Sequence, residues 1–205
     1  MASSFEIAAE QLVQAGRRFD LRGWVLGTSG NFSVVTQRDP LRLAITPSAT
    51  FKGELRADQM LEMDDQAAVV HGARESRPSA EALLHVEIAR ARGAGAVLHT
   101  HSIWSTLLSD AHGDRGGFAI EGYEMLKGLE GVRTHAHREW IPIVENDQDI
   151  PRLADVVRDV LDRQTDAHGF LIRGHGLYTW GADLPRAVRH VEIFEFLLEA
   201  VGRKG

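Results

Sequence analysis

Two histidines separated by one residue, His99 and His101, follow a short apolar run near the middle of the sequence. Side chains two residues apart on a β-strand project from the same face, so both imidazoles are able to reach one cation. Imidazole nitrogen is a common protein ligand of zinc. Residues 96–98, Ala-Val-Leu, are typical of a buried strand, and this context favours a metal-binding pair over chance spacing.

A second pair with the same spacing, His135 and His137, lies in a different context. Arg133, Arg138 and Glu139 surround it, which is typical of a solvated loop. Among ten histidines, chance alone can place two at this spacing. We therefore do not expect this second pair to bind a metal.

The best candidate for a third ligand is His175, which stands between Gly174 and Gly176. Flanking glycines allow close approach of the backbone and let the imidazole turn inward, although the same triplet is equally typical of a tight turn. Three neutral imidazoles with an open fourth position characterise catalytic zinc sites, whereas structural zinc usually has four protein ligands. The absence of cysteine excludes disulfides, thiolate zinc ligands and a thiolate nucleophile.

Three further segments carry hydroxyl or backbone N–H donors suited to an anion. Gly30 and Asn31 belong to a loop of small residues, Ser48 and Lys52 follow an Ile-Thr-Pro segment, and Ser79 stands at the start of a predicted helix. Small-residue loops and helix N-termini both direct N–H groups at anions. Each segment is also explained by an ordinary turn or an N-cap, so the three only suggest an anionic ligand.

Two carboxylates, Glu81 and Glu124, are candidates for a general acid or base. Glu81 lies two residues after Ser79, and Glu124 lies in a Tyr-Glu-Met-Leu-Lys-Gly segment. Burial or a neighbouring metal would shift the pKa of either carboxyl toward a catalytic value. Most glutamates lie on the protein surface and have no chemical role, and this alternative holds for both Glu81 and Glu124.

The composition is that of an ordinary globular protein. The chain has 205 residues, of which 43% are hydrophobic and 25% charged, and no repeat or linker-like tract divides it. We expect one domain over residues 1–205. The 29 acidic residues exceed the 23 basic ones, which argues against a nucleic-acid partner because such binding relies on clustered Lys and Arg.

The sequence gives no sign of a membrane partner. The longest stretch without Asp, Glu, Lys or Arg runs from Gly93 to Ser109 and is rich in polar residues. Crossing a bilayer takes about 20 mostly apolar residues. Glu6 and Glu10 stand where a secretory signal would carry basic residues, so we expect a cytoplasmic location.

Helical and strand patterns are mixed along the chain. Three- and four-residue apolar spacing predicts helices over residues 4–22, 79–92, 150–161 and 185–201, with Asp149 as the N-cap of the third. Short β-branched or alternating runs predict strands over residues 32–36, 41–46, 96–98, 170–173 and 177–180. This mixture favours an α/β fold with helices covering a sheet. Doubly wound nucleotide-binding folds fit poorly, because their glycine-rich motifs are absent.

Five motifs occur in an order that carries a family resemblance. The sequence resembles the class II aldolase and adducin-head family over about residues 5–200, through the motifs G-T-S-G-N-F-S, I-T-P-S, P-S-A-E, A-V-L-H-T-H-S and G-H-G-L. The enzymes of this family use zinc to cleave, epimerise or dehydrate sugar phosphates. The resemblance implies a three-layer α/β/α sandwich around a central, mainly antiparallel sheet. It also implies a homo-oligomer, usually a tetramer, with sites near subunit interfaces.

The resemblance also implies roles for individual residues. One zinc ion per subunit would be held by His99, His101 and His175, and Glu124 matches the acid/base glutamate of the dehydrating members. Glu81 stands where the aldolases carry their own catalytic glutamate. It is therefore a second acid/base, a substrate contact or a residue without a chemical role.

The remaining motif residues match the phosphate-binding positions of the family, namely Gly30, Asn31, Ser48, Lys52 and Ser79. The expected substrate is therefore a small sugar phosphate. Segments around Glu124 and residues 142–146 favour dehydration. The alternatives are a class II aldolase or 4-epimerase, which the presence of Glu81 favours, and a non-catalytic scaffold like the adducin head, against which the three histidines argue.

Overall fold

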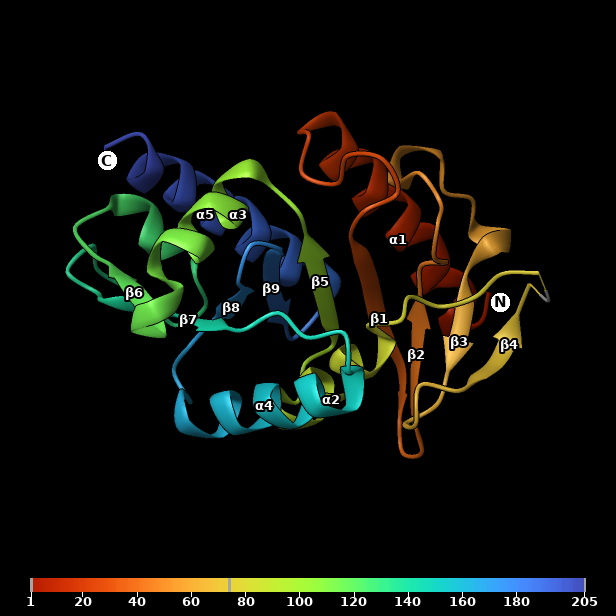
Figure 1. Ribbon diagram of the computed structural model, residues 1–205. Coiled ribbons are helices and arrows are strands. Elements are labelled where there is room, and N and C mark those ends of the chain that lie inside the picture. The colour runs from red at the N-terminus through yellow and green to blue at the C-terminus, as the bar shows by residue number, and fades with distance from the viewer. Residues whose placement is uncertain (1, 74, 205) are drawn as a thin grey trace.

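The computed structural model describes residues 2–73 and 75–204, within which one sheet of nine strands is flanked by five α-helices (Figure 1). The strands are β1 (Asn31–Arg38), β2 (Leu41–Ile45), β3 (Leu61–Met63), β4 (Val69–Gly72), β5 (Ala96–Thr100), β6 (Gly117–Ile120), β7 (Glu139–Val144), β8 (Gly169–Ile172) and β9 (Gly176–Gly181). The helices are α1 (Ser4–Leu21), α2 (Ala82–Arg92), α3 (Ile103–His112), α4 (Ile150–Arg163) and α5 (Leu184–Gly202). None of the helices in these two ranges combines the length and apolarity needed to cross a membrane.

The sheet is mainly antiparallel. Its strands follow the order β4-β3-β2-β1-β5-β9-β8-β7-β6, and β7 and β8 form the parallel pair while the other neighbours run antiparallel. The predicted α/β fold around a mainly antiparallel sheet is therefore confirmed.

Helices cover both faces of this sheet and complete three layers. On one face α2 and α4 pack side by side on residues such as Val97, while α1, α3 and α5 cover the other face (Figure 1). Strand β5 shows the alternation that makes this possible, because Val97 belongs to the first core while Ala96 and Leu98 belong to the second. The predicted three-layer sandwich is confirmed.

Most predicted elements are present with small differences at their ends. Helix α2 begins at Ala82 rather than Ser79, because the Ser79 hydroxyl accepts a hydrogen bond from the Glu81 amide in a turn before the helix. Asp149 caps α4 as predicted, since its carboxylate accepts a hydrogen bond from the Arg152 amide. Boundary shifts of this size are normal for helix ends.

Several elements do not show in the sequence pattern. Strands β3, β4 and β6 have only three or four residues, too few to reveal a period of two. Helix α3 carries Ile103 and Leu107 on its exposed side, with 66% and 54% of their surface accessible, so its apolar residues do not mark one buried face.

Helix α5 contributes a buried carboxyl to the centre of the molecule. Glu195 is 3% exposed and accepts a hydrogen bond of 2.9 Å from the Thr100 hydroxyl on β5. Burial raises the pKa of the Glu195 carboxyl to about 7. In the unfolded chain this carboxyl ionises near its ordinary value of 4.5, so between these pH values the native state holds a proton that the unfolded state has lost.

The Glu195 carboxyl should therefore lower the stability by about 3 kcal/mol as the pH rises from about 5 to about 8, a dependence opposite in sign to that of buried neutral histidines such as His85. We predict that Glu195→Gln, which cannot ionise, flattens this dependence in urea unfolding of chelator-treated protein. Glu199→Gln, one turn further along α5 and partly exposed, removes only a weak repulsion from Glu195 and should keep most of the wild-type dependence. Equal pH dependence in Glu195→Gln and wild type would contradict the assignment.

Candidate metal centre

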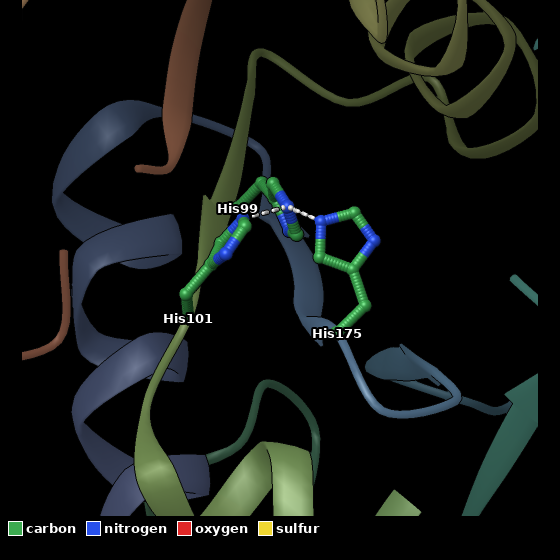
Figure 2. Close-up of side chains that lie close together, drawn as sticks. All are labelled: His99, His101 and His175. Carbon is green, nitrogen blue, oxygen red and sulfur yellow. Dashed lines mark hydrogen bonds between the residues drawn. The ribbon is translucent and has the colours of Figure 1, made fainter. Parts of the chain in front are cut away.

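Three imidazoles converge at the ends of β5 and the β8–β9 turn (Figure 2). The Nε2 atom of His99 lies 2.7 Å from Nε2 of His101 and 3.4 Å from Nε2 of His175. His99 is the penultimate residue of β5, and His101 follows the strand on the same side, as the period of two predicts. The structure thus brings together the three histidines that the sequence pattern singles out.

The turn that carries His175 depends on two glycines. Gly174 has φ of +61°, in the left-handed region where a side chain is disfavoured. Gly176 lies so close to β5 that an added Cβ would overlap the carbonyl oxygen of Thr100. The Gly-His-Gly triplet is therefore a tight turn and, at the same time, the device that turns the imidazole toward His99.

The surroundings keep the imidazoles of His99 and His101 neutral and orient that of His99. Burial lowers the pKa of His99 well below its ordinary value, and the neighbouring His101 and His175 lower it further. Burial, with smaller contributions from His175 and Lys52, lowers the pKa of His101 to about 4. The Nδ1–H of His99 donates to the carbonyl oxygen of Leu177 at 2.9 Å, which leaves the lone pair of Nε2 facing the other two rings.

The donor set fits a divalent transition metal. Three imidazole nitrogens face one point, and all three ligand atoms lie within 4.8 Å of one another. Tetrahedral zinc with three histidine ligands and an open fourth position has this composition. The residues present therefore match a zinc-type centre better than a calcium or magnesium site, which takes oxygen ligands.

A carboxylate lies beside the three imidazoles. Glu81, at the N-cap of α2, places its two oxygens 3.4 Å from Nε2 of His175 and 3.6 Å from Nε2 of His99. Its side chain is 15% exposed. Of the two glutamates that the sequence suggests for acid/base chemistry, Glu81 is the one within reach of this group in the described chain.

A hydrogen-bonded chain behind Glu81 fixes its orientation. The Asn31 amide nitrogen donates to Glu81 Oε2 at 2.8 Å, and the Asn31 carbonyl oxygen accepts from His85 Nε2 at 2.5 Å. Burial lowers the pKa of His85 to about 3, so the ring is neutral and its Nδ1 accepts from the Ser33 hydroxyl at 2.8 Å. The sequence pattern does not reveal His85, although its place four residues after Glu81 on a predicted helix puts both on one face.

Tyr178 is a second residue that sequence reasoning misses. Its ring stacks on His99 with centroids 4.0 Å apart and on Phe170 with centroids 5.2 Å apart. Burial and the charge of Glu81 raise the pKa of the Tyr178 hydroxyl well above its ordinary value. Position 178 directly follows the Gly-His-Gly-Leu motif on a strand, but only the β5–β9 register shows that it faces His99.

The three predicted anion-binding segments form one small cavity beside His101. Pro47 and Pro78 pair as an isolated bridge, and the Ser48 amide donates to the Arg77 carbonyl oxygen at 2.8 Å. The cavity has a volume of about 130 Å³ and is lined by Thr28, Ser29, Gly30, Asn31, Pro47, Ser48, Ala49, Ser79, Glu81 and His101. The Ser29 hydroxyl is buried without a hydrogen-bond partner in the described chain, as expected where a polar ligand completes the bonding.

Lys52 lies behind this cavity rather than in its wall. The side chain is buried, and Nζ donates to the carbonyl oxygens of Thr28 at 3.0 Å and Thr50 at 2.9 Å. Burial lowers the pKa of Lys52 to about 8. Lys52 therefore joins two loops of the cavity and supplies positive charge near it, whereas the sequence suggests a direct contact.

Residues 10–201 match the family described as Class II Aldolase and Adducin N-terminal domain. The chain belongs to this family. The matched range includes the three histidines and the loops of the small cavity.

Two relatives from the family carry one name. The methylthioribulose-1-phosphate dehydratase of Methylococcus capsulatus is 46% identical over 198 residues, which cover 96% of this chain and 94% of that protein. The protein of the same name from Parvibaculum lavamentivorans is 44% identical over 197 residues, which cover 96% and 93% of the two chains. Both alignments include nearly all of the class II aldolase domain described above.

A solved structure supports the fold. The L-fuculose-1-phosphate aldolase of Thermus thermophilus superposes with a TM-score of 0.71 and 22% identity, over 94% of this chain and 92% of that one. At this level of identity the likeness concerns the fold. It places the chain among class II aldolase structures, as the sheet order and layers indicate.

Glu124 lies on the surface of the described chain, and its partners are outside the three-histidine group. It belongs to the 3₁₀ helix η4 (Glu124–Gly128), and its side chain is 70% exposed. Within residues 2–73 and 75–204 its ion pairs are with Lys127 and with His135, at 3.8 Å from the latter. The hydrogen bond and charge of Lys127 lower the pKa of the Glu124 carboxyl, so it is ionised at neutral pH.

The two histidines of the second pair, His135 and His137, have different surroundings. His135 is 64% exposed and lies near Glu124. His137 instead approaches the buried carboxylate of Glu139, with 2.7 Å between Nε2 and Oε2. The solvated loop predicted here therefore describes His135 but not His137.

We predict that His101→Ala lowers the number of bound zinc ions by one per chain, because two imidazoles and water hold zinc far more weakly than three imidazoles. Atomic absorption after exhaustive dialysis measures the loss. His71→Ala, which removes an exposed histidine of β4, should bind as much zinc as wild type. Unchanged zinc content in His101→Ala would refute this centre.

Proposed function

We propose that the chain is a zinc-dependent dehydratase that converts 5-methylthioribulose 1-phosphate to 5-methylthio-2,3-dioxopentyl phosphate in methionine salvage. The observation that carries the proposal is the position of His101, which belongs both to the three-histidine group and to the wall of the hydroxyl-lined cavity. A small phosphorylated ligand would reach both at once. The relatives named methylthioribulose-1-phosphate dehydratase, at 44–46% identity, support this substrate.

The cavity would hold the phosphate. The hydroxyls of Ser29, Ser48 and Ser79 line it, and the Lys52 ammonium lies behind it. Hydroxyl groups donate hydrogen bonds to phosphate oxygens, and a nearby positive charge stabilises the phosphate. Such local groups can bind an anion even when the protein as a whole carries no net positive charge. The negative net charge of −6 is therefore compatible with an anionic substrate.

The reaction removes water from two neighbouring carbons. The C3 proton, α to the C2 ketone, leaves to a base; the C4–O bond breaks, and the departing hydroxyl takes up a proton. The enol that remains then ketonises to the diketone. Zinc bound by His99, His101 and His175 would supply Lewis-acid stabilisation of the negative charge that develops on substrate oxygens.

Glu124 is the proposed acid/base. Its ionised carboxylate would accept the C3 proton and return it to the departing hydroxyl. Because Glu124 is exposed and pairs with residues outside the three-histidine group, we propose that it acts on a substrate bound by a second copy of the chain. A homotetramer with sites at its interfaces would provide this arrangement.

Glu81 has a different proposed role. Asn31 holds one carboxylate oxygen at 2.8 Å, and both oxygens face the imidazoles of His99 and His175. From this position Glu81 would accept a hydrogen bond from a substrate hydroxyl and orient it. It belongs to the binding part of the site rather than to the proton transfer.

We predict that Glu124→Gln lowers the rate of diketone formation by at least about 100-fold, as expected for loss of a positioned acid/base, and keeps the zinc content of wild type. Glu121→Gln is a matched control, because Glu121 is 67% exposed in the same segment and pairs with Arg138. It should retain turnover. Near-normal turnover in Glu124→Gln would contradict its role.

Mixing two inactive variants tests whether the site is shared between copies. Chains with His101→Ala and chains with Glu124→Gln are unfolded together and refolded as mixed oligomers. If each site combines histidines of one chain with Glu124 of another, roughly a quarter of the sites regain both intact parts. Separate refolding is the control, and a mixture that stays inactive would place Glu124 and the histidines in the same subunit.

A class II aldolase is the second candidate, because Glu81 lies beside the three imidazoles. The two functions are distinguished by product. Dehydration of methylthioribulose 1-phosphate gives the diketone, whereas cleavage of fuculose 1-phosphate releases an aldehyde that an aldehyde dehydrogenase detects. We expect the diketone, and aldehyde release without diketone would favour the aldolase. Purified protein without zinc and without either activity would favour a scaffold.

A further inference from the structure

A second group of metal-ligating side chains lies away from the three-histidine group. Glu139 opens β7 and is 1% exposed, and the side chains of His137 and His168 both point at its carboxylate. The three ligand atoms lie within 4.8 Å of one another. A carboxylate as buried as this one needs strong partners, because desolvation of an isolated charge is costly.

Both oxygens of Glu139 face imidazole nitrogens. Oε1 accepts the backbone N–H of His168 at 3.1 Å and lies 3.1 Å from Nδ1 of the same residue. Oε2 lies 2.7 Å from Nε2 of His137 and 3.0 Å from Nδ1 of His168. Two ring nitrogens from separate loops thus converge on this carboxylate, and Oε2 is the oxygen that lies near both of them.

The tautomer of His168 sharpens this picture. Its Nε2–H donates to the carbonyl oxygen of Glu130 at 2.8 Å, which in the neutral ring leaves the lone pair on Nδ1. A neutral ring would turn that lone pair toward the carboxylate of Glu139. Either a proton on Nδ1, which Glu139 favours by raising the pKa of His168 against the effect of burial, or a metal ion must then lie between the two groups. Metal-bound histidines usually donate their second N–H to a backbone carbonyl in this way, and His99 makes the same kind of bond to Leu177.

We propose that His137 Nε2, Glu139 Oε2 and His168 Nδ1 bind a second divalent transition-metal ion such as zinc. Two imidazoles and one glutamate are a common zinc ligand set. Ligands of tetrahedral zinc are about 3.3 Å apart, so the present separations of 2.7 and 3.0 Å require only small outward shifts. The separations in the three-histidine group, 2.7 and 3.4 Å, are similar.

The site is open to solvent on one side. A groove of about 750 Å³ is lined in part by His137, His168 and His190. His190 is not a further ligand, because its Nε2 accepts the Glu130 amide at 3.0 Å and its Nδ1 bonds to the Trp180 carbonyl oxygen at 2.7 Å. The groove therefore gives an ion a route of entry and leaves its fourth position to water or an anionic ligand.

The two metal groups occupy opposite ends of one strand. His168 directly precedes β8, whereas His175 lies in the turn that follows it. An ion at Glu139 is thus separate from the proposed chemistry and would join the loop before β7 to the loop before β8. The same loop before β7 carries His135, which contacts Glu124, so the second ion would hold in place the segment around the proposed acid/base.

Metal counting with single and paired variants tests the proposal. Wild-type protein, dialysed against zinc and then against buffer, should carry two zinc ions per chain, while His137→Ala and His101→Ala should each carry one and the double variant none. His135→Ala is the matched control, because it removes an exposed histidine of the same loop, and it should carry two. His137 suits the test because its side chain is 28% exposed, so its removal leaves the core intact.

A spectroscopic measurement identifies the ligands independently. Co²⁺ added to protein whose three-histidine group already holds zinc should give visible d–d absorption, and this absorption should be lost in Glu139→Gln, which keeps the side-chain volume and an acceptor for the His168 amide. One zinc ion in both wild type and His137→Ala, with no Co²⁺ absorption, would overturn the proposal and leave a proton-bridged group. That result would not touch the proposed dehydratase, which rests on His101 and its neighbours.

Discussion

The pairing of β5 with β9 is the interaction on which the proposed site depends. It places His99 opposite Tyr178, whose ring stacks on the imidazole, and Thr100 opposite Leu177, whose carbonyl oxygen fixes the imidazole tautomer. Because His175 directly precedes β9, the same strand pairing also places its ring beside the other two. A slip of one residue would send the imidazoles to the α1 and α5 side of the sheet, so one register decides the whole centre.

Hydrogen bonds among buried polar groups support this register from both faces. On the α2 side, Ser33, His85 and Asn31 form a chain that ends on Glu81. On the α5 side, Thr100 donates to Glu195. Each buried group left without a partner would cost about 1–3 kcal/mol, so alternative packings of this centre are penalised. Orientation of the imidazoles and of Glu81 is thereby built into the core rather than into mobile loops.

The two candidate metal groups make different demands on the fold. The three-histidine group joins two central elements and adjoins a hydroxyl-lined cavity, so a metal held there would lie beside a place for a small anion. The group at Glu139 joins two loops at the other end of β8 and faces a wide groove. Only the first has the neighbours on which the proposed function rests. The second suits a role in holding loops together, including the segment of Glu124.

The sequence by itself determined the elements with strong periodicity and the pairing of His99 with His101, because strand alternation is a local property. The mainly antiparallel α/β class and His175 as the third member followed from the family resemblance of its motifs. The short strands and α3 could not be predicted. A strand of three or four residues is too short to show alternation, and the exposed apolar side chains of α3 obscure its helical spacing. Only tertiary structure decided that Lys52 lies behind the cavity, that Glu124 is exposed, and which distant partners surround a histidine. His137 shows this best: its neighbours in sequence are those of a loop, yet Glu139 and His168 meet it through the pairing of β7 with β8.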